Sequence, residues 1–188
     1  MQADPTVRTA RTTLTRPVAG DLDELATLHA DARVWEHLPS GRHTGPEATA
    51  RLLLAVQRSW ESAGLGSWVV RDAGSGELLG LGGCDLRVAG GLRWWNLGYR
   101  LHRAVWGRGL AQEVITEARA EAGRRAPDLA VVAFLLEHNE GSRRAAERAG
   151  LRLVGRGPDR GNPDPQAVRL VFADREVDED LLSAVLGA

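Results

Sequence analysis

The sequence predicts a mixed α/β (α+β) fold, with a mostly antiparallel sheet of about seven strands and helices on both of its faces. Short β-prone runs cluster in the middle of the chain and again near its end, and amphipathic helical patterns separate them. Short glycine-containing turns join the central runs, which favours antiparallel hairpins. One strand–helix–strand passage in the middle of the chain adds a crossover, which makes the sheet mixed.

Length and composition indicate one main domain of an ordinary soluble globular protein. The chain has 188 residues, 43% hydrophobic and 26% charged, and a formal net charge of −1 with acidic and basic residues interleaved. This charge pattern argues against nucleic acid or a membrane surface as a partner. No stretch is apolar enough to span a membrane and no secretory leader is evident, so we expect a cytoplasmic protein.

The reactive residue types exclude several kinds of chemistry. All 24 basic residues are Arg, so Schiff-base and lysine-base mechanisms are excluded. Cys84 is the single cysteine and lies in an apolar run, where we expect it to be buried and inert. A disulfide within the chain and a cysteine-rich metal site are therefore excluded, and we expect no metal.

The first half of the chain is predicted to hold a strand, two helices and three further strands. The first strand covers residues 12–17, and Asp21 with Glu24 forms a capping-box-like opening for the first helix. Thr44 is expected to cap the second helix, which ends at Gly64. The three strands that follow are expected at residues 67–72, 77–87 and 92–101.

The second half is predicted to hold a helix, a strand, a short helix and two more strands. The apolar stripe of its first helix consists of Ala111, Val114, Ile115, Ala118 and Ala122. The later elements are expected at 129–136 (strand), 139–150 (helix), and around 151–157 and 167–172 (strands). We divide the chain into an N-terminal extension (1–11), the main domain (12–175) and a tail (176–188) with a short helix.

The segment "WGRGLA", residues 106–111, opens a helix with glycines where a polar cap is usual. A P-loop would need a lysine, and a dinucleotide fingerprint would need a small residue at Gln112, so both fail. Two interpretations stay open for this segment alone: a turn without ligand, and the pyrophosphate loop of acyl-coenzyme A enzymes. In the second, backbone amides of residues 106–111 receive the phosphates, and Arg103 and Arg108 add charge.

Two longer segments decide between these interpretations. "LGYRLHRAVWGRGLAQEVITEA", followed one strand later by "LLEHNEGSRRAAERAGLRLVG", closely resembles the GNAT superfamily of acyl-coenzyme A-dependent N-acyltransferases. The resemblance is strongest to the branch of ribosomal-protein N-terminal alanine and serine acetyltransferases, and it covers roughly residues 12 to 173. It implies a GNAT-like sheet, a coenzyme A site at the central strand–helix–strand unit, and acetyl-CoA as cosubstrate.

The resemblance also implies site residues. Residues expected to bind the coenzyme are Arg100, Leu101, His102, Arg103, Trp106, Gly107, Arg108, Gly109, Leu110, Ala111, Asn139, Ser142 and Arg144. An amide near Leu101 would face the thioester oxygen, as in an oxyanion hole. Asn139 and Ser142 are alternatively explained as the cap and first turn of a helix. Arg144 alternatively pairs with Glu140.

The acid and the base are the least determined roles. Many relatives place a tyrosine where this chain has Ala146, so Ser142, or a water that it holds, is the expected proton donor. Relatives often carry Glu where this chain has Asn96, and an amide cannot act as a base. Asp85 is the best remaining carboxylate, although the residue type and position favour a solvated strand-end Asp over a base; His102 and a water relay are further alternatives.

These features together predict an acetyl-CoA-dependent N-acetyltransferase. The acceptor would be a primary amine, either a protein or peptide N-terminus or a small molecule, that attacks directly in a ternary complex. Loops 35–47 and 157–166 are expected to set the width of the acceptor groove. The alternative is a catalytically weak acyl-CoA-binding sensor or partner-binding protein. We expect a monomer or homodimer.

Overall fold

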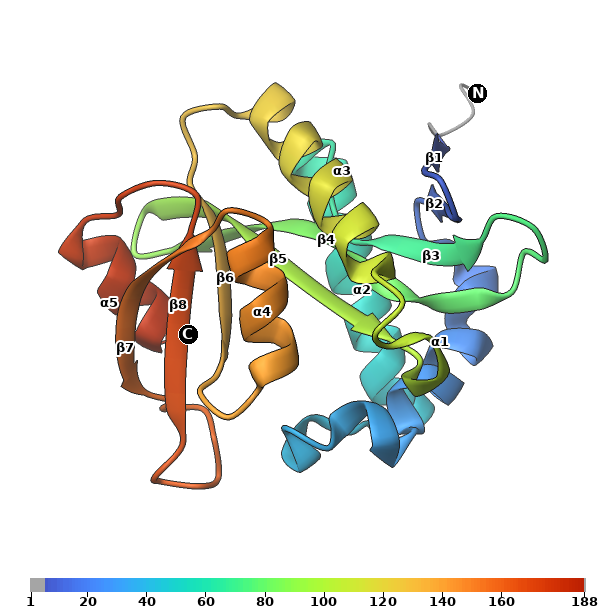
Figure 1. The fold of residues 1–188 in the computed structure, drawn as a ribbon, viewed down its shortest axis with the longest axis horizontal. Helices are drawn as coiled ribbons and strands as arrows, with labels where there is room; N and C mark the ends of the chain where they lie inside the picture. Colours follow the sequence, from blue (N-terminus) through green and yellow to red (C-terminus); the bar gives the residue numbers. More distant parts are fainter. Residues whose placement is uncertain (1–5, 188) are drawn as a thin grey trace.

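Eight strands form one sheet in the computed structural model, which describes residues 6–187 (Figure 1). The strand order is β1-β2-β3-β4-β5-β6-β8-β7, and all neighbours are antiparallel except β5 and β6. The strands are β1 (Val7–Arg8), β2 (Thr12–Thr15), β3 (Trp68–Asp72), β4 (Leu78–Ala89), β5 (Leu92–Leu101), β6 (Val131–Leu136), β7 (Arg152–Pro158) and β8 (Val168–Ala173). The strand beyond the seven expected is the two-residue β1, which pairs with β2.

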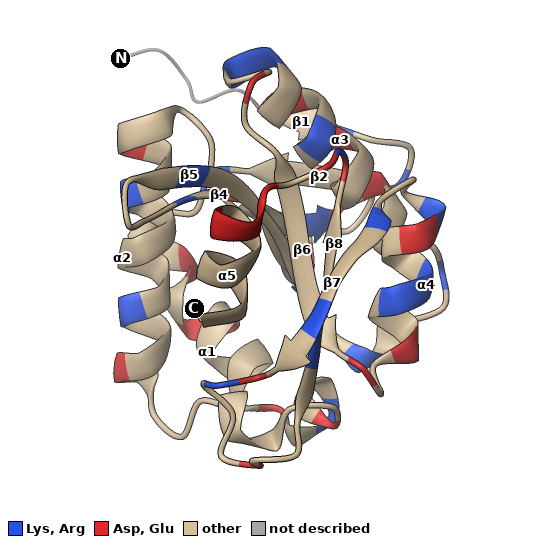
Figure 2. Cartoon of the chain, turned by 90° about the vertical axis from the view of Figure 1, so that its left-hand side faces the viewer, with Lys and Arg blue, Asp and Glu red and all other residues tan. Residues whose placement is uncertain are grey.

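Five α-helices cover both faces of this sheet, as predicted. They are α1 (Leu22–Ala30), α2 (Pro46–Ala63), α3 (Leu110–Arg125), α4 (Glu140–Arg148) and α5 (Glu179–Gly187). Helices α1, α2 and α5 lie on one side of the sheet and α3 and α4 on the other (Figure 2). No helix among the described residues is long and apolar enough to cross a membrane.

The ends of the first two helices follow local sequence signals, with one correction. The Asp21 side chain accepts a hydrogen bond from the Val18 amide (2.8 Å) and so starts the turn before α1. The expected cap of α2, Thr44, is wrong by one residue, because Pro46 occupies the first helical position and Gly45 the cap. Gly64 ends α2 with a φ of 69°, a left-handed conformation that favours glycine.

Strand β5 alternates as the sequence predicts and separates the two layers. Trp95 and Leu97 are buried, and Tyr99 shares their face, towards α3. On the opposite face, Trp94 packs with Val185 of α5 in a second, smaller core cluster. The central strand is therefore held by large apolar side chains on both sides.

The parallel pairing between β5 and β6 is short, and it determines where the site lies. Only two positions pair, Trp95 with Val131 and Asn96 with Val132. Beyond them β5 continues along β4, whereas β6 continues along β8. The two strands consequently diverge and leave a wedge that side chains and a cavity occupy.

Candidate functional site: a cavity between diverging strands

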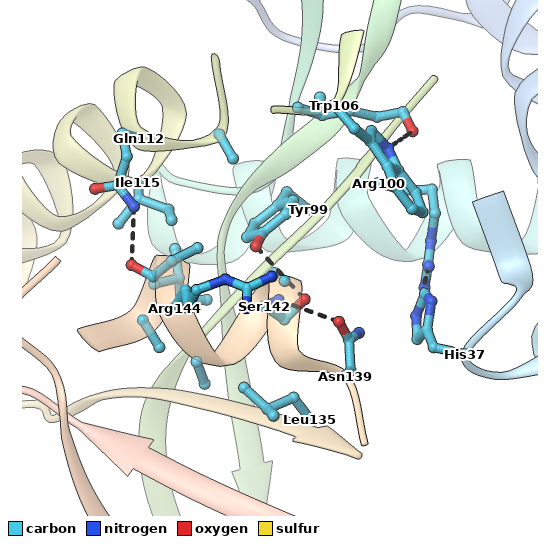
Figure 3. A pocket seen from close by; sticks show the side chains of 18 of the residues that line it. His37, Tyr99, Arg100, Trp106, Gln112, Ile115, Leu135, Asn139, Ser142 and Arg144 are labelled. Atoms are coloured by element: carbon cyan, nitrogen blue, oxygen red, sulfur yellow. Dashed lines mark hydrogen bonds between the residues drawn. The ribbon is translucent and has the colours of Figure 1, made fainter. Parts of the chain in front are cut away.

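A cavity of about 610 Å³ fills the wedge between β5 and β6 (Figure 3). The N-terminal part of α3 and the helix α4 form its walls. Of the residues expected from sequence to bind the coenzyme, those that line it are Arg100, Leu101, Trp106, Gly107, Gly109, Leu110, Ala111, Asn139, Ser142 and Arg144. The structure thus brings together segments about 40 residues apart around one opening.

One edge of β5 presents backbone amides to this cavity. The amide of Trp95 donates to the Ala130 carbonyl beside β6 (2.9 Å), whereas the amide of His102 donates to Leu79 beside β4 (2.9 Å). Since successive amides point in opposite directions, those of Leu97, Tyr99 and Leu101 face the wedge. The expectation that an amide near Leu101 is available therefore fits the geometry.

His102 and the backbone of Arg100 do not fit that expectation. The His102 amide is used by β4, His102 does not line the cavity, and the Arg100 amide points to β4 by the same alternation. The Leu101 carbonyl accepts a hydrogen bond from the Trp106 indole (2.9 Å), which fixes the end of β5 against the glycine loop.

The glycine loop opens α3 without a side-chain cap. Gly107 and Gly109 have φ values of 74° and 78°, and Gly109 occupies the cap position of α3 with no side-chain hydrogen bond. The first-turn amides of a helix lack intrahelical partners and, with the helix dipole, attract anions. A Cβ added at Gly107 would meet no atom within 4 Å, so the loop borders open space. These features fit a bound pyrophosphate.

Arg103 and Arg108 do not line the cavity, contrary to the expectation that they contact its ligand. The Arg103 guanidinium lies over the Trp106 ring, 4.7 Å from its centroid, and 3.9 Å from the Glu36 carboxylate.

The N-terminal hairpin supports the glycine loop, which the sequence did not indicate. Arg11 donates to the Arg108 carbonyl (2.6 Å) and to Glu113 in the first turn of α3 (2.6 Å from Nε). Thr9 also donates to Glu113. Residues expected to form a mere extension therefore hold the opening of α3, and nothing in their spacing reveals a contact across about 100 residues.

At the start of α4, Asn139 and Ser142 combine helix capping with a place in the cavity. The Asn139 side-chain oxygen accepts a hydrogen bond from the Ser142 amide (3.1 Å), as a cap does. The Tyr99 hydroxyl lies 3.5 Å from Ser142 Oγ, and burial raises the pKa of Tyr99, so the phenol stays protonated at neutral pH. Arg144 also lines the cavity, but its guanidinium binds Glu140 (2.9 Å).

The structure places Asp85 away from the cavity. Its carboxylate accepts hydrogen bonds from the Ser67 amide (3.0 Å) and hydroxyl (2.8 Å), and it does not line the opening. Burial raises the pKa of Asp85, against the lowering effect of the Ser67 hydrogen bonds. Asp85 therefore joins β4 to the segment before β3 and has no access to an acceptor.

On the other side of β5, Arg100 and His37 form a polar cluster at the cavity mouth. Arg100 Nη1 donates to the Val34 carbonyl (2.9 Å) and lies 3.0 Å from His37 Nε2, and the guanidinium lies over the Trp35 ring (3.7 Å). Burial and the Arg100 charge lower the pKa of His37 to about 4, so its ring is neutral at pH 7. Asn96 lines the same cavity, with a buried side-chain oxygen that has no hydrogen-bond partner among residues 6–187.

A groove of about 450 Å³ continues from the cavity to the surface. It shares His37, Leu38 and Leu136 with the cavity and runs between residues 36–40 and 162–168. The two loops expected to border an acceptor groove thus border this groove. His37 had escaped the sequence analysis because it lies in an irregular loop, where no periodicity marks its orientation.

A match to a protein-family model shows the family of the chain. The model for the acetyltransferase (GNAT) domain matches residues 11–152. The chain belongs to the GNAT acetyltransferases. Enzymes of this family use acetyl-CoA as the acetyl donor, and the amide edge of β5 and the uncapped opening of α3 fit that cosubstrate.

Solved structures share this fold along nearly the whole chain. A putative GNAT-family acetyltransferase from Bordetella pertussis is 24% identical with a TM-score of 0.77, and the match covers 91% of this chain and 99% of that one. An acetyltransferase from Agrobacterium tumefaciens is 25% identical (TM-score 0.73; 92% and 95% covered). The ribosomal-protein-S5-alanine acetyltransferase from Vibrio fischeri is 14% identical (TM-score 0.72; 94% and 98% covered).

Proposed function

We propose that this GNAT enzyme transfers the acetyl group of acetyl-CoA to a primary amine by direct attack in a ternary complex. The observation that carries the proposal is the cavity itself, in which the free amides of β5 meet the uncapped, glycine-lined opening of α3. The acyl donor supplies an activated thioester when bound. The amides of Leu101 and Tyr99 hold its arm and polarise the thioester carbonyl.

The leaving thiolate needs a proton, and two hydroxyl groups stand near the start of α4. The amine nitrogen forms a bond to the carbonyl carbon, and the carbon–sulfur bond breaks. Ser142 then donates its hydroxyl proton to the sulfur, and the protonated Tyr99 phenol, 3.5 Å from Ser142 Oγ, replaces that proton. Solvent water returns a proton to Tyr99. Tyr99 thus supplies, through Ser142, the proton that the side chain of Ala146 cannot supply.

The attacking amine loses its proton to solvent water in this proposal. Among the described residues that line the cavity, Asp159 alone carries a carboxylate, and Arg169 binds it (2.5 Å). The neutral His37 ring, with a pKa of about 4, is too weak a base near pH 7. The Asn96 oxygen accepts a hydrogen bond from the amine and so orients it.

The acceptor is an N-terminal amine of a peptide or a small primary amine. The groove between residues 36–40 and 162–168 supports an extended acceptor, because it meets the cavity, which Asn96 also lines, at His37, Leu38 and Leu136. The likeness to the Vibrio fischeri ribosomal-protein-S5-alanine acetyltransferase is in line with such an acceptor.

Thermal unfolding with acetyl-CoA, and with ATP and NAD as controls, tests the proposal first. A ligand at about 100 times its Kd stabilises the folded state by roughly 2.7 kcal/mol, which raises the midpoint by several degrees in a chain of this size. We expect the shift with acetyl-CoA alone, followed by thiol release with amines and N-terminal peptides. No shift at saturation contradicts acetyl-CoA binding. A shift without product from any amine favours an acyl-CoA sensor instead.

A further inference from the structure

We propose that the acceptor carries a carboxylate and that the Arg100 side chain binds it. This inference rests on the proposed function and narrows its substrate class to amines with an anionic group several bonds from the nitrogen. The argument depends on which groups Arg100 contacts, on the face of β5 from which it projects, and on the charges around it.

The guanidinium of Arg100 lacks a carboxylate partner among residues 6–187. Its neighbours there are the Val34 carbonyl, the neutral His37 ring and the face of Trp35. Both of its hydrogen bonds use Nη1, so the edge formed by Nε and Nη2 has no acceptor among the described residues. That edge is the one with which arginine binds a carboxylate through two parallel hydrogen bonds.

Two other guanidinium groups of the cavity, those of Arg169 and Arg144, differ from Arg100 in this respect, and the third, that of Arg148, belongs to an exposed residue. Arg169 donates from Nε and Nη2 to the Asp159 carboxylate (2.9 and 2.5 Å). Arg144 binds Glu140 at the surface. Burial lowers the pKa of Arg100 to about 10, yet the group stays cationic at pH 7. A partly buried cation with no counter-charge raises the free energy of the empty protein, and an anionic ligand removes that penalty.

The face of β5 that carries Arg100 also offers a place for the amine. Asn96, Gly98 and Arg100 project from the same face, and a Cβ added at Gly98 would meet nothing nearer than Asn96 Nδ2 at 4.0 Å. Gly98 therefore leaves open space between the Asn96 oxygen, which has no partner in the described part of the chain, and the Arg100 guanidinium. Figure 3 shows Arg100 extending towards His37, away from Tyr99 and Ser142, which stand on the opposite face.

The spacing along β5 sets the size of the acceptor. Asn96 and Arg100 are four positions apart, which places their Cα atoms roughly 13 Å apart at about 3.3 Å per residue. An amine at Asn96 and a carboxylate at Arg100 are thus separated by several bonds even when both side chains lean inwards. An N-terminal peptide with an acidic second residue, or an ω-amino acid, has this chemistry, whereas glycine is too short.

Matched acceptors that differ only in charge test the inference on the full chain. The peptide pair is alanyl-glutamate amide and alanyl-glutamine amide, and the small-molecule pair is 5-aminopentanoate and 5-aminopentanamide. With saturating acetyl-CoA, we expect thiol release to give a kcat/KM at least roughly 10-fold higher for a charged member than for its neutral partner, as a charge-assisted hydrogen bond allows. Which pair shows the preference tells a peptide acceptor from a small one.

Variants distinguish carboxylate binding by Arg100 from a purely structural role of its side chain. Arg100→Gln should abolish the preference mainly by raising the KM of the charged acceptor, and Arg100→Lys should retain part of it. Arg42→Gln is the control, because Arg42 also donates to a backbone carbonyl near the end of α1 (Ala30, 2.6 Å) but does not line the cavity. It should keep the preference. Equal kcat/KM for both members of each pair, or a preference that survives in Arg100→Gln, overturns the inference.

A binding measurement distinguishes failure of this inference from failure of the proposed function. The acetylated products of both pairs are titrated by calorimetry into the protein saturated with coenzyme A. Tighter binding of a charged product that is lost in Arg100→Gln supports the anion site even if no amine is acetylated, in which case the proposed function alone fails. Equal binding of charged and neutral products overturns the anion site.

Discussion

Comparing Gly107→Ala with Gly76→Ala distinguishes the effect of backbone strain from the loss of a ligand contact. Gly107 has a φ of 74°, and Gly76, in the turn between β3 and β4, has a φ of 76°. An added Cβ meets no atom within 4 Å at either position, so neither variant suffers a clash. Both suffer the same left-handed strain of about 1–2 kcal/mol. Of the two, only Gly107 lines the cavity.

The two variants should therefore match in stability and differ in binding. In a domain of this length, each kcal/mol lowers the unfolding midpoint by about 2–4 °C, so both should unfold roughly 2–8 °C below the wild type. Gly107→Ala also places a methyl group in the loop proposed to receive pyrophosphate. Loss of one hydrogen bond to a charged group, about 1.5–3 kcal/mol, weakens acetyl-CoA binding roughly 10- to 150-fold.

Calorimetric titration with acetyl-CoA and thermal unfolding without ligand give both quantities from the same preparations. Gly76→Ala should bind acetyl-CoA as the wild type does. If Gly107→Ala binds as tightly as Gly76→Ala, the glycine loop does not hold the phosphates and the reasoning is refuted.

Three further substitutions test other parts of the site and the core. Ser142→Ala should lower kcat and leave the Kd of acetyl-CoA within about threefold, since it removes a proton donor and not a binding charge; unchanged kcat in stopped-flow thiol assays would exclude Ser142 from the reaction. Asp85→Asn should keep kcat within a few-fold, because Asp85 contacts Ser67 and not the cavity, whereas loss of a general base costs about 10²–10⁴-fold. Burial and the charge of His43 lower the pKa of His29 from 6.5 to about 3. The neutral ring therefore contributes its full stability above pH 6.5, and this contribution is lost as the pH falls towards 3. Urea unfolding of His29→Leu between pH 7 and 4.5 should show a weaker loss of stability than the wild type, and an identical pH dependence would contradict this assignment.

The parts of the site predicted from sequence are those that local rules determine. The alternation of β5, the glycine opening of α3 and the Asn139 cap of α4 each depend on residues within one turn or one strand. Cys84 is buried as its apolar surroundings predict, and burial raises the pKa of its thiol.

The parts that were missed depend on contacts between distant segments. Asp85 has the residue type of a general base. However, the amide and hydroxyl of Ser67 donate hydrogen bonds to its two carboxylate oxygens, and these contacts determine where the side chain points. The side chain of Arg100 likewise acquires its role from Val34, Trp35 and His37, which lie more than 60 positions earlier. Strand periodicity assigns such residues to a face but does not say what stands opposite them.

The short parallel pairing of β5 and β6 divides the sheet into two plates joined at a seam. Residues 7–101 build the plate of β1 to β5, residues 131–173 build the plate of β6 to β8, and the chain crosses between them once. Two paired positions and the apolar cluster around Trp94 and Val185 join the plates. A ligand lying along the free edge of β5 and against α4 touches both plates at once. It therefore adds contacts across the junction where the backbone pairing is shortest.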